Sequence, residues 1–312
     1  MVWNAYYRGD NEPGRKVELP AAPRWRTFPR PPEGEGEFFR PPDGLIEAVN
    51  AALVLRRPLL VTGPPGSGKS TLIESVAREL GLGTVLRWHI TSRSTLADAV
   101  YRYDVLGRIH AQQVAQAQGK TAADKITDFL QLGPLGAALA SATPRALLID
   151  EIDKSDLDLP GDLLNVLERG EYEIPELVRE EDQDLQVRER DSKVTHRIRE
   201  GRIQCAAFPV IVLTSNGERS FPPPFLRRCV RFQMPPLTTE LLTEIVRAHL
   251  GPEVVARVET LIAAFEENLR AGRTVAVDQL LNAVFLRTGK AAPPAEDQDR
   301  LTKLLLQKLT DA

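Results

Sequence analysis

A glycine-rich stretch between residues 63 and 70 constrains this chain more than any other feature. It runs Gly63-Pro64-Pro65-Gly66-Ser67-Gly68-Lys69-Ser70 and matches the pattern G-x-x-x-x-G-K-S/T. The short apolar run 59–61 precedes it, and apolar residues at helical spacing follow it through 72–80. A strand, a glycine-rich loop and a helix in this order form one mononucleotide-binding unit, so the pattern predicts an α/β fold. A chance match is expected only about once in a hundred chains of this length.

The residue types of this loop suit the binding of a nucleoside triphosphate. Glycines let successive backbone N–H groups turn inward around phosphate oxygens, and the next helix points its positive end at them. Lys69 brings a mobile positive charge to the β- and γ-phosphates, and the hydroxyl of Ser70 can bind Mg²⁺. We therefore predict that residues 63–70, together with Thr71, hold the nucleotide.

Two adjacent carboxylates follow a second apolar run, residues 146–149. Asp150 is placed to hold Mg²⁺ through its water shell, and Glu151 is placed to polarise the attacking water. A solvated acidic turn is the alternative, and the upstream phosphate loop disfavours it. The charges that continue at Asp153, Lys154 and Asp156 are expected to be surface or subunit-contact charges.

A third apolar run, 210–213, ends in Thr214-Ser215-Asn216. Asn216 is the candidate for positioning the hydrolytic water near the γ-phosphate. Farther along, Arg227 and Arg228 follow the segment 221–226. Such an arginine can reach a γ-phosphate across a subunit boundary and stabilise charge in the transition state. Ion pairing within the chain is the alternative, and the local sequence leaves both open.

Composition changes divide the chain into three parts. Residues 1–42 are rich in proline, which prevents helices and sheet ladders, yet they carry large aromatic side chains. We expect an extended arm that packs on the body or on a neighbouring subunit. Residues 43–236 alternate helical patterns with apolar runs, including 85–90, which predicts a parallel sheet covered on both faces. Residues 237–312 show only helical periodicity and predict a small helical domain.

The charge and the apolar content exclude several classes of protein. The net charge is −3 and the pI is about 5.9, so no general basic field favours nucleic acid. No run approaches the roughly 20 apolar residues of a membrane span, and the first ten residues do not resemble a signal peptide. Cys205 and Cys229 lack metal-site spacing and are expected to be reduced thiols. These features predict a soluble cytoplasmic protein.

Together, the motifs resemble the AAA+ ATPases of the MoxR type. The resemblance covers roughly 43–290 and rests on GPPGSGKS at 63–70, LLIDEIDKSD at 147–156, LLNVLERGEYEIPE at 163–176 and TSNGERSFPPPFLRRC at 214–229. It implies a P-loop NTPase fold with a parallel five-stranded sheet flanked by helices, followed by a small all-α lid domain. It also implies a homo-oligomer, usually a hexameric ring, with ATP and Mg²⁺ between subunits. Members remodel or activate partner proteins, often proteins with von Willebrand factor A domains.

The resemblance also assigns roles to individual residues. Lys69 and Ser70 correspond to the Walker A pair, and Asp150 and Glu151 correspond to Walker B. Asn216 is similar to sensor 1. Of the arginine pair, Arg228 best matches the arginine finger and Arg227 is second.

Two regions depart from the family pattern or extend it. The lid arginine called sensor 2 is expected near the start of the helix at 277–286, where Arg273 is the nearest arginine and Val277 stands at the matching place. A polar stretch at 91–131 falls where MoxR-type proteins carry an insert, and 178–204 is expected to form a hairpin. These stretches either face the pore or a client, or are solvated inserts.

The sequence favours an ATP-driven protein remodeller over two alternatives. One is a nucleotide-dependent assembly switch or scaffold with slow turnover; the retained Glu151 argues for hydrolysis but sets no rate. The other is a nucleic-acid-linked AAA+ motor, which the acidic pI makes unlikely. The preference for ATP over GTP follows from the resemblance, since nothing in the loop selects the base.

Overall fold

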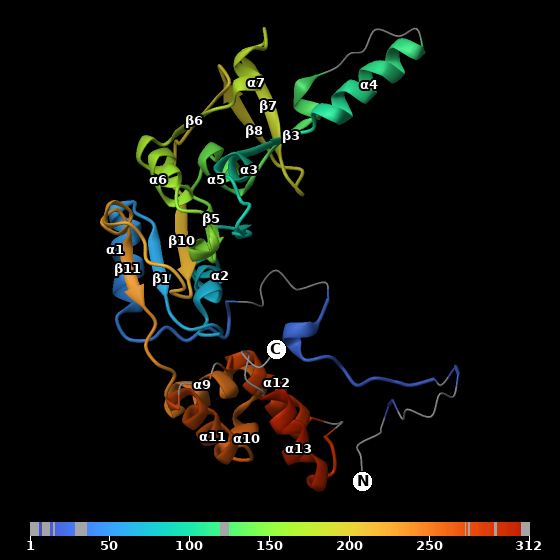
Figure 1. The fold of residues 1–312 in the computed structure, drawn as a ribbon, viewed down its shortest axis with the longest axis vertical. Helices are drawn as coiled ribbons and strands as arrows, with labels where there is room; N and C mark the ends of the chain where they lie inside the picture. Colours follow the sequence, from blue (N-terminus) through green and yellow to red (C-terminus); the bar gives the residue numbers. More distant parts are fainter. Residues whose placement is uncertain are drawn as a thin grey trace. The chain divides into compact units, whose positions relative to one another are not determined.

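The computed structural model describes residues 6–7, 13–14, 16–28, 36–118, 125–271, 273, 275–289 and 292–306. The chain divides into two compact units (Figure 1). The first, here called the α/β unit, contains Asp43–Gly63 and Leu72–Gln233. The second, here called the helical unit, contains Met1–Pro42, Pro64–Thr71 and Met234–Ala312.

A parallel five-stranded sheet forms the centre of the α/β unit. Its strands are β1 (Leu59–Thr62), β2 (Leu86–His89), β5 (Ala146–Asp150), β10 (Val210–Ser215) and β11 (Val230–Gln233), in the order β11-β1-β10-β5-β2. All four pairings are parallel, so the predicted P-loop NTPase sheet is confirmed. In the register of the sheet, Thr62 lies opposite Ser215 and His89 lies opposite Asp150. The polar residues that end these strands therefore share one edge of the sheet.

Strands β1, β5 and β10 are apolar along most of their length because helices cover the sheet. Leu60, Leu147 and Leu213 are at most 1% exposed. The helices of the unit include α1 (Leu45–Leu55), α5 (Pro134–Ala140), α6 (Leu159–Arg169), α7 (Pro175–Val178) and α8 (Pro223–Leu226), and α2 (Lys69–Glu79) follows the phosphate loop. Helix α5 packs so closely that a Cβ on Gly136 would lie 1.9 Å from the carbonyl oxygen of Val100. Only glycine fits at that crossing.

The sequence did not place β11 or a second sheet in the α/β unit. The side chains of β11 alternate between half-buried and exposed, as expected of an edge strand, so no apolar run marks it. The second sheet has the order β3-β4-β7-β8-β9-β6 and is built from short strands. They are β3 (Tyr101–Tyr103), β4 (Leu130–Leu132), β6 (Glu171–Glu173), β7 (Asp184–Glu189), β8 (Thr195–Arg199) and β9 (Arg202–Gln204).

The two polar stretches supply much of this second sheet. The hairpin predicted at 178–204 is confirmed, since β7 and β8 pair antiparallel. The stretch 91–131 contains α3 (Leu96–Val100), β3 and α4 (Val105–Ala117); its residues 119–124 lie outside the described part. Helix α4 has no buried residue, and Figure 1 draws it away from the five-stranded sheet.

A buried charge network ties the hairpin to the central sheet. Oε1 of Glu189 on β7 lies 2.7 Å from Nε2 of His196 on β8 and 3.0 Å from Nη1 of Arg145. Arg145 directly precedes β5, and its guanidinium also donates to the carbonyl of Thr84. The network therefore connects the hairpin with the strand that carries the acidic pair.

The C-terminal part of the helical unit is all helical. Its helices are α9 (Thr239–Leu250), α10 (Pro252–Val255), α11 (Glu259–Arg270), α12 (Val277–Thr288) and α13 (Ala295–Leu305). Leu242, Phe265 and Leu280 are fully buried in its core. None of the helices in the described residues is long and apolar enough to cross a membrane.

Candidate functional site

The phosphate loop is curled by its own backbone and side chains. Ser67 Oγ and Lys69 Nζ both donate to the carbonyl of Pro64, each at 2.8 Å. Gly66 and Gly68 have φ of 73° and 84°, a region that costs other residues roughly 1–2 kcal/mol. Ser67 and Lys69 are only 6% and 7% exposed. The loop therefore holds a lysine charge and a run of backbone N–H groups at the start of α2, an arrangement that fits a phosphate chain.

The acidic pair at the end of β5 is held by the neighbouring strand. Thr214 Oγ1 donates to Asp150 Oδ1 at 2.6 Å and accepts from the backbone N–H of Glu151 at 2.9 Å. Glu151 has φ of 59°, in the left-handed region. One buried hydroxyl on β10 therefore fixes the direction of both acids. Thr214 was not among the predicted site residues, although it stands two positions before Asn216.

Glu151 lies within reach of three side chains. Lys154 Nζ donates to Glu151 Oε2 at 2.8 Å, and Asn216 Nδ2 lies 3.5 Å from Glu151 Oε1. His89 Nε2 lies 3.4 Å from Glu151 Oε2. The hydrogen bond to Glu151 is the main cause that raises the pKa of Lys154. The structure thus brings together Glu151 and Asn216, which the sequence separates by 65 positions.

His89, the last residue of β2, was not among the predicted site residues. Its Nδ1 lies 3.8 Å from Asp150 Oδ2, so its ring spans both acids. The side chain is 62% exposed and is open to water. The signal was weak, because His89 lies inside the run 85–90, whereas Asn216 follows the end of its run.

Asp153 was expected at the surface and this was wrong, because it is 2% exposed. Its Oδ2 accepts hydrogen bonds from the backbone N–H groups of Asn216 at 2.9 Å and Glu218 at 3.0 Å. The nearby charges also have partners within the chain: Lys154 bonds Glu151, and Asp156 Oδ1 accepts from Leu159 N at the start of α6.

The arginine pair follows the short helix α8. Phe225 anchors that helix in the core with 1% of its surface exposed, and Arg57 Nη1 donates to the carbonyl of Arg227 at 3.0 Å. The Arg227 side chain is exposed. Arg228 Nε lies 3.5 Å from Glu168 Oε1 in a partly exposed ion pair, as the intramolecular alternative expected. Beside them is an open groove of about 460 Å³ whose lining includes Asp158, Asp162, Asn165, Pro222 and Arg228.

The start of α12, where a sensor 2 arginine was expected, is apolar. Val277 is the first residue of the helix, and a Cβ on Gly66 would lie 2.8 Å from the Cβ of Ala276 and 2.9 Å from the backbone N of Val277. Arg273 Nη1 donates instead to Asn268 Oδ1 at 2.6 Å. The residue beside the phosphate loop is therefore Ala276, and Arg273 is bound at the end of α11.

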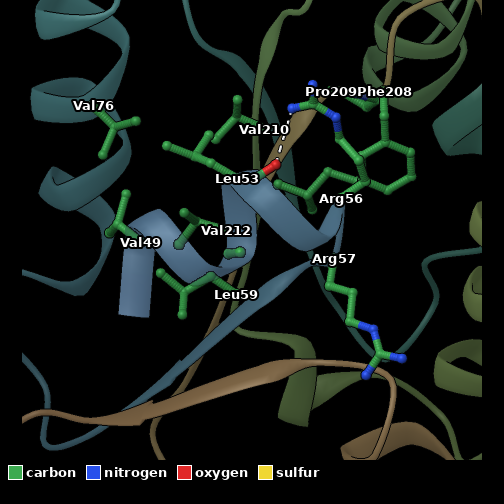
Figure 2. Close-up of a pocket in the computed structure, with 12 residues that line it drawn as sticks. Val49, Leu53, Arg56, Arg57, Leu59, Val76, Phe208, Pro209, Val210 and Val212 are labelled. Atoms are coloured by element: carbon green, nitrogen blue, oxygen red, sulfur yellow. Dashed lines mark hydrogen bonds between the residues drawn. The ribbon is translucent and has the colours of Figure 1, made fainter. Parts of the chain in front are cut away.

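A second hollow lies at the end of the central sheet that is opposite to the acidic pair (Figure 2). Leu59 and Val210, the first residues of β1 and β10, line it with Val49 and Val76. Arg56 at its mouth is turned back to the carbonyl of Leu53 at 2.9 Å. Its volume of about 20 Å³ has room for about one water molecule and is far too small for a nucleotide.

Comparison with known families gives a match over the part of the chain that contains the loop and the acidic strand end. A family model described as AAA domain (dynein-related subfamily) matches residues 58–229, more than half of the 312-residue chain. The chain belongs to this AAA family. The matched part includes the phosphate loop, the acidic pair, Asn216 and both arginines. Membership identifies a nucleotide-binding domain of the AAA+ ATPase class.

More distant comparisons add little to this assignment. No curated protein matches the chain. The crystal structure of domain III from the Thermotoga maritima replication initiation protein DnaA is similar at 15% identity, with 87% of this chain and 96% of that chain covered and a TM-score of 0.42. A likeness at this level says nothing about what this AAA protein acts on.

Proposed function

We propose that this AAA protein is a MoxR-type ATPase that couples ATP binding and hydrolysis in an oligomeric ring to the remodelling or activation of a partner protein. The observation that carries the proposal is the position of Glu151. Its carboxylate stands at the end of β5, in reach of Asn216, on a backbone that Thr214 holds. A carboxylate that is partly exposed beside an amide donor is suited to orient and deprotonate a water molecule.

The chain's own residues divide the remaining tasks. Residues 63–71 would hold the triphosphate of ATP, with the Lys69 ammonium against its outer phosphates. The Ser70 hydroxyl and, through water, the Asp150 carboxylate are the hard oxygen donors that Mg²⁺ prefers. Bound Mg²⁺ would neutralise the phosphate oxygens. Asn216 would orient the attacking water towards the γ-phosphate while Glu151 accepts its proton.

The arginine pair makes the proposed ATP hydrolysis depend on assembly, because the arginine would act on a phosphate bound to the next subunit. The Arg228 side chain is held by a partly exposed contact with Glu168, which solvent screens. It can therefore exchange that partner for a phosphate of the next subunit at little cost. We propose Arg228 as the arginine finger, with Arg227 second, in a ring that is hexameric in related ATPases. The client we propose is a protein, of the kind that carries a von Willebrand factor A domain, in the cytoplasm.

The test is ATP hydrolysis measured across protein concentration, with particle mass followed in parallel. Turnover is expected to rise as the protein assembles. Lys69→Ala should lose nucleotide binding, Glu151→Gln should keep binding but lose turnover, and Arg228→Ala should lose turnover while binding is kept. Arg202→Ala, which removes an exposed arginine paired with Glu173, is the matched control and should leave turnover unchanged. Full activity in a dilute monomer would refute the shared site.

One observation favours a second candidate, a nucleotide-dependent assembly switch with slow turnover. Lys154 Nζ donates a hydrogen bond of 2.8 Å to Glu151 Oε2. Without this bond, the same oxygen would accept the proton of the attacking water. If this contact persists with nucleotide bound, hydrolysis is slow and assembly is the output. Lys154→Met separates the two candidates, because it should speed the turnover of a switch and leave a motor unchanged or slower.

A further inference from the structure

Two described segments of the N-terminal arm, residues 24–28 and 36–40, carry aromatic side chains into the helical unit. Trp25 Nε1 donates to Asn282 Oδ1 on α12 at 2.9 Å. Its ring meets those of His249 and Phe285 edge-on, with centroids 6.0 and 5.9 Å away. A tryptophan that both packs and donates is anchored in one orientation. The arm is therefore fixed to α9 and α12 at this point.

The second segment reaches the same helices at His249. The ring centroids of Phe38 and His249 are 5.1 Å apart. The central carbon of the Arg24 guanidinium lies over the Phe38 ring, 5.4 Å from its centroid. The two arm segments thus share one contact on α9. Each arm segment supports the other through the Arg24 contact, which is of the cation–π kind.

Phe39 is the arm residue that contacts the phosphate loop. A Cβ on Gly68 would lie 3.3 Å from Cε2 of the Phe39 ring and 3.6 Å from Cδ2, so the ring rests directly on the loop. The backbone around it is fixed, because Phe39 N donates to Gly36 O and Arg40 Nη1 donates to Phe39 O at 3.1 Å. Ala276, before α12, meets the same loop at Gly66. Arm and helix therefore contact two neighbouring glycines of one loop.

We infer that the arm is a strap that joins α9 and α12 to the phosphate loop, and that Phe39 is a positioning residue that slows nucleotide release. This inference rests on the proposed function, since it concerns the nucleotide that the loop would bind. The ring limits the movement of Gly68, and a nucleotide leaves only when the loop N–H groups that surround its phosphates move apart. Trp25 keeps the ring in place by holding the arm on the helices. Loss of either aromatic therefore frees the loop.

The experiment measures the dissociation of mant-ADP, a fluorescent nucleotide, from the full chain by stopped flow in the presence of Mg²⁺. Phe39→Ala should release mant-ADP about tenfold faster, which corresponds to about 1.4 kcal/mol. Trp25→Ala should act in the same direction, and the double variant should release no faster than the faster single variant, because both remove one strap. Tyr7→Ala is the matched control, since Tyr7 lies in the same arm but is 84% exposed. It should release at the wild-type rate.

The outcomes separate this inference from the proposed function. Phe39→Leu keeps an apolar side chain and should restore most of the slow release, and thermal unfolding of each variant shows that it is folded. Release from Phe39→Ala at or below the wild-type rate would overturn the strap. An additive double variant would do the same. If the wild type binds no mant-ADP, with Lys69→Ala as the non-binding reference, the proposed function itself fails.

Discussion

Replacing Thr214 by valine tests whether one hydroxyl sets the acidic pair. Valine keeps the shape and the β-branch of threonine but removes the oxygen. Thr214 is 1% exposed, so water does not replace what is lost. The substitution breaks the hydrogen bond to Asp150 and leaves the backbone N–H of Glu151 without its acceptor.

The size of the effect follows from these two contacts. A hydrogen bond to a carboxylate contributes about 1.5–3 kcal/mol, and a neutral bond about 1 kcal/mol. The extra buried methyl of valine offsets roughly 0.8 kcal/mol. The net loss is therefore about 2–3 kcal/mol, which lowers the melting temperature by roughly 5–10 °C for a unit of this size. Turnover should fall by about a hundredfold, since displacing a reacting group by about 1 Å has that cost.

Thermal unfolding and ATP hydrolysis of the valine and serine variants make the comparison. Thr214→Ser keeps the hydroxyl and loses only a methyl group, so it should lose about 1 kcal/mol and retain most of its turnover. A valine variant with the stability and turnover of the serine variant would refute the assigned role of the hydroxyl.

Three further substitutions test the rest of the structure. Glu189→Gln should destabilise the α/β unit by about 3 kcal/mol in chemical denaturation, because it removes the carboxylate that balances the charge of Arg145 in the buried network with His196. An unchanged denaturation midpoint would contradict this. Burial and two nearby arginines lower the pKa of His249 in the folded protein below its ordinary value of 6.5. The stability that neutral His249 contributes is therefore present above pH 6.5 and is lost as the pH falls through the lowered pKa. His249→Gln should remove this loss, so its melting temperature should fall less steeply on the acid side. Phe265→Ala should cost about 3–5 kcal/mol, and Phe265→Leu clearly less, since this ring is fully buried in the helical unit.

The sequence predicts those parts of the fold that have long, uniform patterns. Three of the five central strands, β1, β5 and β10, are apolar on both faces and stand out as runs, and the C-terminal helices show a clear helical period. Strand β11 does not stand out, because Arg231 and Gln233 face water at the sheet edge. The strands of the second sheet are mostly short, and their pairing joins segments as far apart as 131 and 188, which no local pattern records.

The candidate site divides in the same way. The loop and the acidic pair are local motifs, and the sequence places them. His89 and Thr214 come near the acids only because β2 and β10 flank β5 in the sheet, and Asp153 reaches the turn after β10 for the same reason. Their roles depend on the order of the strands in the sheet, which a single sequence does not reveal.

Asp153 illustrates how such a residue governs a motif that it does not belong to. One of its oxygens accepts from two backbone N–H groups, those of Asn216 and Glu218, and so fixes the turn that follows β10. Bonds to a charged acceptor are about twice as strong as neutral ones, and this acceptor is buried. The direction of the Asn216 side chain, and with it the 3.5 Å approach to Glu151, is therefore set by a carboxylate two residues beyond Glu151 itself. The short segment that carries Glu151 thus also positions Asn216, so the spacing between Glu151 and Asp153 is a further constraint on the site.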